Sequence, residues 1–136
     1  MQENGALVKD ILVPISPGEL LDKITILRIK AARMSDAAKV ANVKHELGLL
    51  EKTWQDSGAA AVNIGNEEAN LTHVNEKLWV IEDEIRDEER AKRFGDRFIE
   101  LARAVYFTND ERAAIKKRIN TLSGSTIVEE KSYKQY

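Results

Sequence analysis

The stretch that decides the fold is Glu67–Arg90, which reads EEANLTHVNEKLWVIEDEIRDEER. Its apolar residues recur at alternating intervals of three and four positions: Leu71, Val74, Leu78, Ile81 and Ile85. This spacing places the five side chains in one stripe along an α-helix, with the narrow width of a coiled-coil seam. We therefore predict one long amphipathic helix over these residues.

A second stretch upstream has the same spacing. Its apolar residues are Val40, Val43, Leu47, Leu50 and Trp54. Two helices with matching seams, joined by the break at 56–66, predict a long antiparallel helical hairpin with coiled-coil packing. Gly48 lies inside the first of these helices, which indicates the close approach of another backbone. Because so narrow a seam can also bind a second copy of the chain, we expect a homodimer.

The composition is typical of a soluble, helix-rich protein with a single domain over residues 1–136. The formal net charge of −2 gives no general attraction to nucleic acid or to anionic membranes. The chain contains no cysteine, which excludes disulfides and suits a cytosolic protein. It has no signal peptide pattern and no apolar run of the roughly 20 residues that span a membrane. We expect a cytoplasmic protein that binds no nucleic acid and inserts into no membrane.

The sequence Ser16–Glu19 marks the start of an earlier helix. Ser16 is expected to accept from the first-turn amides, and Glu19 to reach back to the amide of Ser16. Pro17 suits the first helical position, where its missing N–H donor has no partner to lose. We predict a helix from Pro17 to Arg33. Its apolar residues occupy more than one face, so it should pack on more than one neighbour.

Two further helices are predicted downstream, over residues 96–107 and 108–122. The break between them rests on Thr108 and Glu111, which have the spacing of a capping box, and a single continuous helix is the alternative. The predicted fold is all-α: a long hairpin packed by three further helices. Ile11–Ile15 and Thr126–Val128 have strand-like composition and would add a small two-stranded ribbon from the termini.

The first candidate site lies on one face of the Glu67–Arg90 helix. Asn75, Trp79, Glu82 and Arg86 follow one another at intervals of four, three and four positions. Trp79 offers a flat surface, Glu82 a base, and Arg86 a fork for a carboxylate or phosphate. The alternative is an ion pair within the helix between Glu82 and Arg86, beside a packed Trp79.

The second candidate site lies further along the chain. Arg103, Tyr106 and Asn109 are spaced three positions apart, and Lys116 and Asn120 follow. An arginine beside a tyrosine suits an anionic or sugar ligand, and the alternative is a plain helix surface with its cap. Together the two sites supply the ligand-binding candidates Asn75, Trp79, Glu82, Arg86, Arg103, Tyr106 and Asn109. No catalytic residue is assigned.

Carboxylates flank the two seams, among them Glu46, Glu82 and Glu89. Helical nucleotide pyrophosphatases hold Mg²⁺ between carboxylates on facing helices, since hard oxygen ligands suit that ion. The stretch 37–55 lacks the paired acidic motif of those enzymes, so we predict no metal site and no cofactor.

Three stretches together resemble a small uncharacterised bacterial family. They are Val13–Leu27 (VPISPGELLDKITIL), Val74–Arg86 (VNEKLWVIEDEIR) and Val105–Asp110 (VYFTND). Members of that family occur near glycosyltransferases of cell-surface polysaccharide and lipopolysaccharide synthesis, and sometimes joined to them. The resemblance implies a role around glycan assembly and assigns no active-site residue.

Two hypotheses for the function follow. The preferred one is a non-enzymatic helical accessory module that binds a partner, in particular a glycosyltransferase of surface-glycan assembly. The alternative is a small enzyme or binder of an anionic sugar-phosphate or nucleotide, of the magnesium-dependent pyrophosphatase type.

Overall fold

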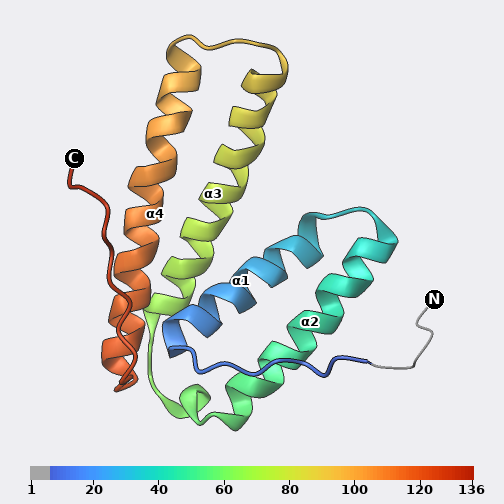
Figure 1. The fold of residues 1–136 in the computed structure, drawn as a ribbon, viewed down its shortest axis with the longest axis vertical. Helices are drawn as coiled ribbons and strands as arrows, with labels where there is room; N and C mark the ends of the chain where they lie inside the picture. Colours follow the sequence, from blue (N-terminus) through green and yellow to red (C-terminus); the bar gives the residue numbers. More distant parts are fainter. Residues whose placement is uncertain (1–6) are drawn as a thin grey trace.

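The computed structural model describes residues 7–136, which form the all-α fold that the sequence predicts (Figure 1). Within these residues there are four α-helices, one short 3-10 turn and no β-strand. The elements are α1 (Pro17–Arg33), α2 (Ala37–Asp56), η1 (Ala59–Ala61), α3 (Asn66–Arg90) and α4 (Asp96–Leu122).

The helices are arranged as two hairpins. The most extensive packing is between α3 and α4, which form the long antiparallel pair, and α2 packs back along α1. The central helix is α1, since it also contacts α3 and α4. In Figure 1 the α1–α2 pair lies against the lower half of the α3–α4 hairpin, so the upper half of that hairpin projects beyond the rest.

The prediction that α2 and α3 form the hairpin is wrong. The α3 seam is buried as expected, with Leu71, Val74, Leu78 and Ile81 all in the interior, but it is covered by α1 and α4. The seam of α2 is largely half-exposed, and Trp54 is the one residue of that helix that is fully buried. Spacing identifies the buried stripe of a helix but does not identify its partner.

Helix α1 begins at Pro17 as predicted, but the Glu19 carboxylate bonds to Lys116 and not to the Ser16 amide, so only one half of the predicted capping box is present. The Ser16 hydroxyl accepts a hydrogen bond from the Glu19 amide at 3.2 Å, which satisfies one of the first-turn donors. The expectation of several packing partners is also confirmed, because buried side chains occur all around this helix. They are Leu20, Leu21, Ile24, Leu27 and Ile29.

The helix α4 is continuous, so the predicted break at Thr108 is wrong and the single-helix alternative is correct. Thr108 lies in the middle of α4 and is 1% exposed. A continuous helix keeps Leu101, Ile115 and Ile119 buried together along one face. The capping-box spacing of Thr108 and Glu111 also occurs within helices, where the N–H groups already bond to the preceding turn.

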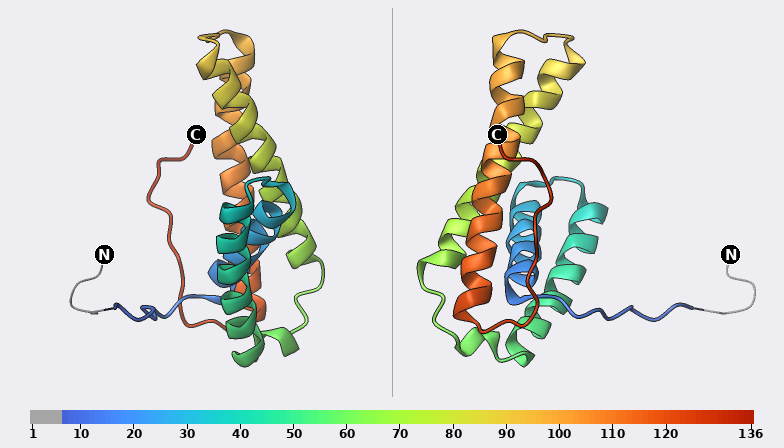
Figure 2. Two further views of the ribbon diagram at one scale, coloured as in Figure 1. Left: turned by 90° about the vertical axis from the view of Figure 1, so that its right-hand side faces the viewer. Right: turned by 60° about the vertical axis from the view of Figure 1, so that its left-hand side comes forward.

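The two ends of the chain do not form the predicted ribbon in the described residues. Figure 2 shows residues 7–15, which we call the N-terminal arm, leading away from the helices, whereas the tail (residues 125–136) turns at the foot of α4 and runs back along it. Ile15 packs against the core and anchors the arm. The two segments therefore leave the fold on different paths, and neither supplies a strand edge to the other.

The break between α2 and α3 is ordered by packing on the core. Ile64 is buried in the core, and Ala59 and Val62 pack against it. Gly48 differs from expectation, because no backbone approaches it: a Cβ there would have nothing within 4 Å.

Candidate functional site

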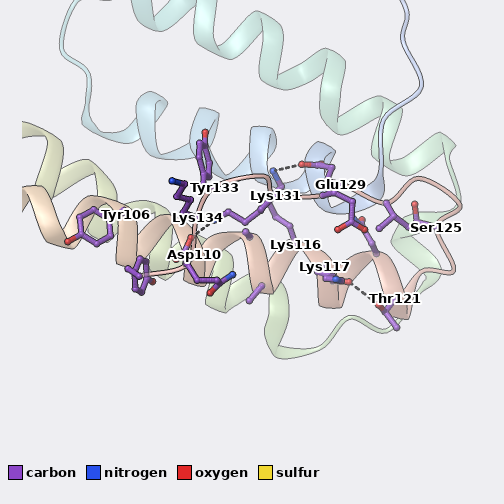
Figure 3. Close-up of a pocket in the computed structure, with 17 residues that line it drawn as sticks. Tyr106, Asp110, Lys116, Lys117, Thr121, Ser125, Glu129, Lys131, Tyr133 and Lys134 are labelled. Atoms are coloured by element: carbon purple, nitrogen blue, oxygen red, sulfur yellow. Dashed lines mark hydrogen bonds and ion pairs between the residues drawn. The ribbon is translucent and has the colours of Figure 1, made fainter.

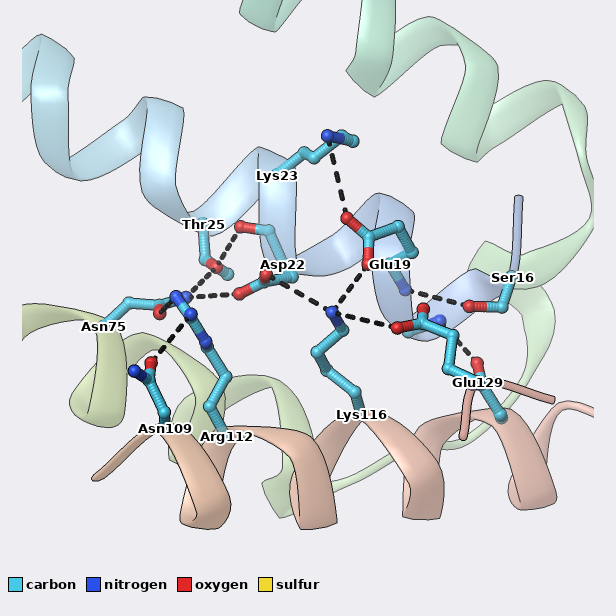
Figure 4. A network of polar contacts seen from close by, with 12 residues as sticks. Ser16, Glu19, Asp22, Lys23, Thr25, Asn75, Asn109, Arg112, Lys116 and Glu129 are labelled. Carbon is cyan, nitrogen blue, oxygen red and sulfur yellow. Dashed lines mark hydrogen bonds and ion pairs between the residues drawn. The ribbon is translucent and has the colours of Figure 1, made fainter. Parts of the chain in front are cut away.

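A cluster of buried and half-buried polar side chains lies where α1, α3 and α4 meet (Figure 4). We call it the polar junction; its members are Asp22, Thr25, Asn75, Asn109, Arg112, Lys116 and Asn120. Asn75 is at its centre and is 4% exposed. Its amide donates to the Asp22 carboxylate at 2.8 Å and to the Thr25 hydroxyl at 2.9 Å. This places a side chain of α3 against two of α1.

Arg112 extends the junction to α4. Its guanidinium donates to the side-chain oxygen of Asn75 at 3.3 Å and to that of Asn109 at 2.9 Å. The oxygen and the nitrogen of the Asn75 amide therefore both form hydrogen bonds, as expected for a buried amide.

Lys116 is the main charged link between α4 and α1. Its ammonium donates to Glu19 at 2.6 Å and lies 3.7 Å from both Asp22 and Glu129. Burial of Lys116 opposes its charge, but the hydrogen bond to Glu19 and the nearby carboxylates outweigh that effect and raise its pKa. Burial likewise opposes the ionisation of Glu19, yet Lys116 holds the pKa of Glu19 below its ordinary value.

The first turn of α1 also contacts α4 through its backbone. The Gly18 amide donates to the Asn120 side chain at 2.7 Å, and both residues are buried. A Cβ on Gly18 would lie 2.5 Å from the backbone oxygen of Lys116, so only glycine allows the two helices to come so close.

These contacts explain what the junction does. Each charged group in it lies within reach of an opposite charge or an amide oxygen, at distances of 2.6 to 3.7 Å. A network of this kind destabilises the fold when one of its members lacks a partner, and it favours a single arrangement of the helices when all members are paired. The junction therefore fixes how α1, α3 and α4 cross, and it forms one wall of a nearby cavity.

The cavity lies between α4 and the tail, and we call it the tail cavity (Figure 3). Its volume is about 900 Å³, and Lys116 and Asn120 are shared with the polar junction. Tyr106, Asp110 and Lys117 line it from α4, and Lys131, Tyr133 and Lys134 line it from the tail. The tail cavity combines cationic and aromatic side chains.

Three side chains of the tail hold it against α4: Glu129, Lys131 and Tyr136. Lys131 bonds to Asp110, and the phenol of Tyr136 bonds to the same carboxylate. The ring of Tyr136 also packs on Phe107, with 4.6 Å between the ring centroids, and on Tyr106, at 5.4 Å. Further down the tail, Glu129 approaches Lys116.

The residues of the first candidate site separate in the structure. Asn75 turns inward to the polar junction, and Trp79 is half-buried. Glu82 and Arg86 bond to each other on the exposed surface of α3, which is the alternative raised for that pair. Neither Glu82 nor Arg86 lines the tail cavity or the shallow groove along α4.

The residues of the second candidate site also lie apart. Asn109 belongs to the polar junction through Arg112, and Tyr106 lines the tail cavity. Arg103 lies over the ring of Phe107, 5.7 Å from its centroid, beside a shallow groove of about 420 Å³ along α4. Glu82, Arg86, Arg103 and Tyr106 therefore do not converge on one pocket.

Asp22, Thr25 and Arg112 belong to the junction but are not among the sequence candidates. Asp22 and Thr25 do carry a signal, because they lie next to Leu21 and Ile24 in a helix whose apolar residues extend around several faces. A polar residue within so broad an apolar surface is expected to be buried with a partner. No comparable signal marks Arg112.

Within residues 7–136, no group of three or more histidine, aspartate or glutamate side chains is placed to hold a metal ion. None of the described helices is both long enough and apolar enough to cross a membrane.

The fold and the junction define an all-helical protein with a cavity closed by its own tail. The model of a family of unknown function, DUF6165, matches residues 11–136, and the chain belongs to this family. No curated protein and no solved structure matches it.

Proposed function

We propose that the protein is a non-enzymatic helical module that acts by binding other protein chains. The observation that carries this proposal is the amount of surface that the chain leaves exposed. Its accessible surface is 9791 Å². A compact monomer of its mass, 15.4 kDa, is expected to expose about 7,200 Å². The excess of about 2,600 Å² exceeds the ~800 Å² per partner of a standard protein interface.

Much of the exposed apolar surface lies on the N-terminal arm. Five apolar side chains of the arm are 66% to 91% exposed: Leu7, Val8, Ile11, Leu12 and Val13. A largely apolar segment of this kind, interrupted by Lys9 and Asp10, is typical of a docking element, since isolated surface apolar residues are ordinary but clusters are not. Ile15, packed on the core, would hold the arm to the fold while the rest engages a partner.

A second exposed apolar surface lies on the projecting half of the α3–α4 hairpin. Val80, Ile99 and Phe107 are exposed there, and the shallow groove on α4 runs between Ile99 and Phe107. A second copy of the chain is the occupant that we propose for this surface, because two helical hairpins pack readily into a four-helix arrangement. The protein would then be a homodimer.

For the N-terminal arm we propose a partner other than a second copy of the chain. The family resemblance points to a glycosyltransferase of bacterial surface-glycan assembly, and the absence of cysteine from the chain suits a cytoplasmic setting. In this proposal the dimer presents two arms to such an enzyme. The magnesium pyrophosphatase alternative has less support, because it rests on facing seams of α2 and α3, whereas α3 packs mainly on α4 and α1.

The dimer is tested by sedimentation velocity over a range of protein concentrations. We expect a concentration-dependent dimer for the wild-type chain, and mostly monomer for the variant Ile99→Asp, which leaves the contact between Phe107 and the tail in place. The matched control is Leu49→Asp, since Leu49 is an exposed leucine on α2, away from the hairpin. A wild-type chain that sediments as a monomer at every concentration contradicts the dimer.

The arm is tested by affinity capture from the native bacterium. We expect the wild-type chain to capture a glycosyltransferase that the variant Ile11→Asp/Val13→Asp does not capture, while Leu49→Asp captures it normally. Equal capture by all three chains shows that the arm is not the docking element. Repeated recovery of no specific protein by the wild-type chain contradicts the module hypothesis.

A further inference from the structure

We propose that the tail cavity is a binding site for a nucleoside phosphate, with Lys117 and Lys134 on the phosphate and the ring of Tyr133 against the base. The cavity lining shares no residue with the exposed surfaces described above, although Tyr136 of the lining packs on Phe107. Of the seven candidate residues, only Tyr106 lines the cavity. The proposal rests on three features of the cavity: its uncommitted charge, its aromatic side chains and its size.

The charge comes from the lysines that the protein does not neutralise itself. Of the four lysines that line the cavity, Lys116 and Lys131 are paired, with Glu19 and Asp110 respectively. Lys117 and Lys134 have no ion-pair partner among residues 7–136. Glu130, which also lines the cavity, likewise has no ion-pair partner among residues 7–136. Lys117, Lys134 and Glu130 together therefore carry a net positive charge. This balance suits a ligand with one phosphate.

The aromatic side chains provide a flat surface beside that charge. Tyr133 is 82% exposed, and the ammonium of Lys131 lies 5.8 Å from its ring centroid. Figure 3 shows the Tyr133 ring upright next to Lys134 at the cavity, while Tyr106 lies further along α4. A free tyrosine face stacks on a nucleobase without base specificity, as the aromatic side chains of single-strand binding proteins do.

The volume of the tail cavity favours a nucleoside phosphate over an inorganic anion. Small-molecule sites have volumes of roughly 300 to 1,000 Å³. The tail cavity, at about 900 Å³, is therefore large enough for a base, a sugar and a phosphate, and too large to be specific for inorganic phosphate alone. Access requires only that the tail move, and its ion pair between Lys131 and Asp110 is 42% exposed on both sides, so it opposes that motion weakly.

The test is a calorimetric titration of the full chain with AMP and UMP, alongside adenosine and inorganic phosphate. We expect AMP or UMP to bind, and adenosine and phosphate each to bind at least about tenfold more weakly, because each retains only one half of the contacts. The double variant Lys117→Ala/Lys134→Ala should lose at least about tenfold in affinity. Tyr133→Ala should also weaken binding, while Tyr133→Phe should retain it.

The matched control for charge is Lys52→Ala/Lys92→Ala, which removes two exposed lysines outside the cavity lining. Circular dichroism confirms that each variant is folded. The proposal is overturned if neither AMP nor UMP binds at millimolar concentration, or if both lysine pairs reduce affinity equally. It is also overturned if inorganic phosphate binds as tightly as AMP, since the tyrosine ring would then contribute nothing.

Discussion

At the scale of single residues, two glycines in helices have opposite surroundings. A Cβ on Gly18 would lie 2.5 Å from the backbone oxygen of Lys116, and a Cβ on Gly48 would meet nothing within 4 Å. We expect Gly18→Ala to destabilise the protein by about 1–3 kcal/mol, because α1 and α4 must separate. Gly48→Ala should stabilise it by up to about 1 kcal/mol, through helix propensity alone. Urea denaturation measures both, and a loss for Gly48→Ala contradicts the open surroundings of that residue.

A second residue-scale prediction concerns Asn75. Replacing it with alanine removes the amide that bonds to Asp22, Thr25 and Arg112, and leaves those buried groups short of a partner. We expect a loss of about 2–3 kcal/mol in the free energy of unfolding, measured by urea denaturation. The control is Asn70→Ala, an exposed asparagine on the same helix. A loss for Asn75→Ala no larger than that for Asn70→Ala contradicts the role of the junction, because alanine has the higher helix propensity at both positions.

The third residue-scale prediction follows from the lowered pKa of Glu19. A carboxylate with a folded-state pKa below its ordinary value of 4.5 contributes stability above that pH, and loses it as the pH falls through the folded value. Glu19→Gln should therefore destabilise the protein at neutral pH. The gap from wild type should narrow in urea denaturation as the pH falls below about 4.5. A gap that is constant from neutral pH to pH 3 contradicts the pairing with Lys116.

At the scale of elements, the tail is the segment whose attachment can be followed directly. The hydrogen bond to Asp110, burial and the Asp110 charge together raise the pKa of Tyr136 to about 12. Because this folded-state pKa lies above the ordinary value of 10, the contribution of the contact is complete below pH 10 and is lost as the pH rises through about 12.

Ultraviolet titration of the tyrosines measures this attachment. We expect one phenol to ionise near pH 12 in the wild-type chain, and the same phenol to ionise at lower pH in Asp110→Ala. The assignment is checked with Tyr136→Phe, which should lack the late transition. A late transition that persists in Asp110→Ala shows that the tail is not held by this carboxylate.

At the scale of the whole molecule, stability is expected to be uneven. The central helix α1 contacts the other three and is buried on several sides, whereas α2 packs mainly on α1 and buries only Trp54 completely. Local opening requires least free energy where few apolar contacts are lost. Amide hydrogen exchange should therefore be slowest in α1 and in the part of the α3–α4 hairpin beside it, and faster in α2. Equal protection of α1 and α2 contradicts this ordering.

Helices α1 and α3 and the Ser16 cap could be predicted from neighbouring residues alone, whereas the cap predicted at Thr108 is wrong. Ser16 and Asp36 each accept from the amide three residues on, at 3.2 and 3.0 Å, because cap chemistry involves only residues of the same turn. The helical stripe of α3 was recognisable for the same reason. The site was predicted less well: Asn75 and Asn109 belong to the junction, but Asp22, Thr25 and Arg112 join it only when three helices cross.

What the sequence determined by itself is therefore local: an all-α chain, the bounds of α1, α2 and α3, and the apolar stripe of α3. Only the tertiary structure decided that this stripe faces α1 and α4, that Thr108 lies inside one long helix, and that the tail closes a cavity. The physical reason is that capping and periodicity depend on residues a few positions apart. Helix pairing depends on which distant surfaces fit most closely, as Gly18 and Asn120 do across 102 positions of chain.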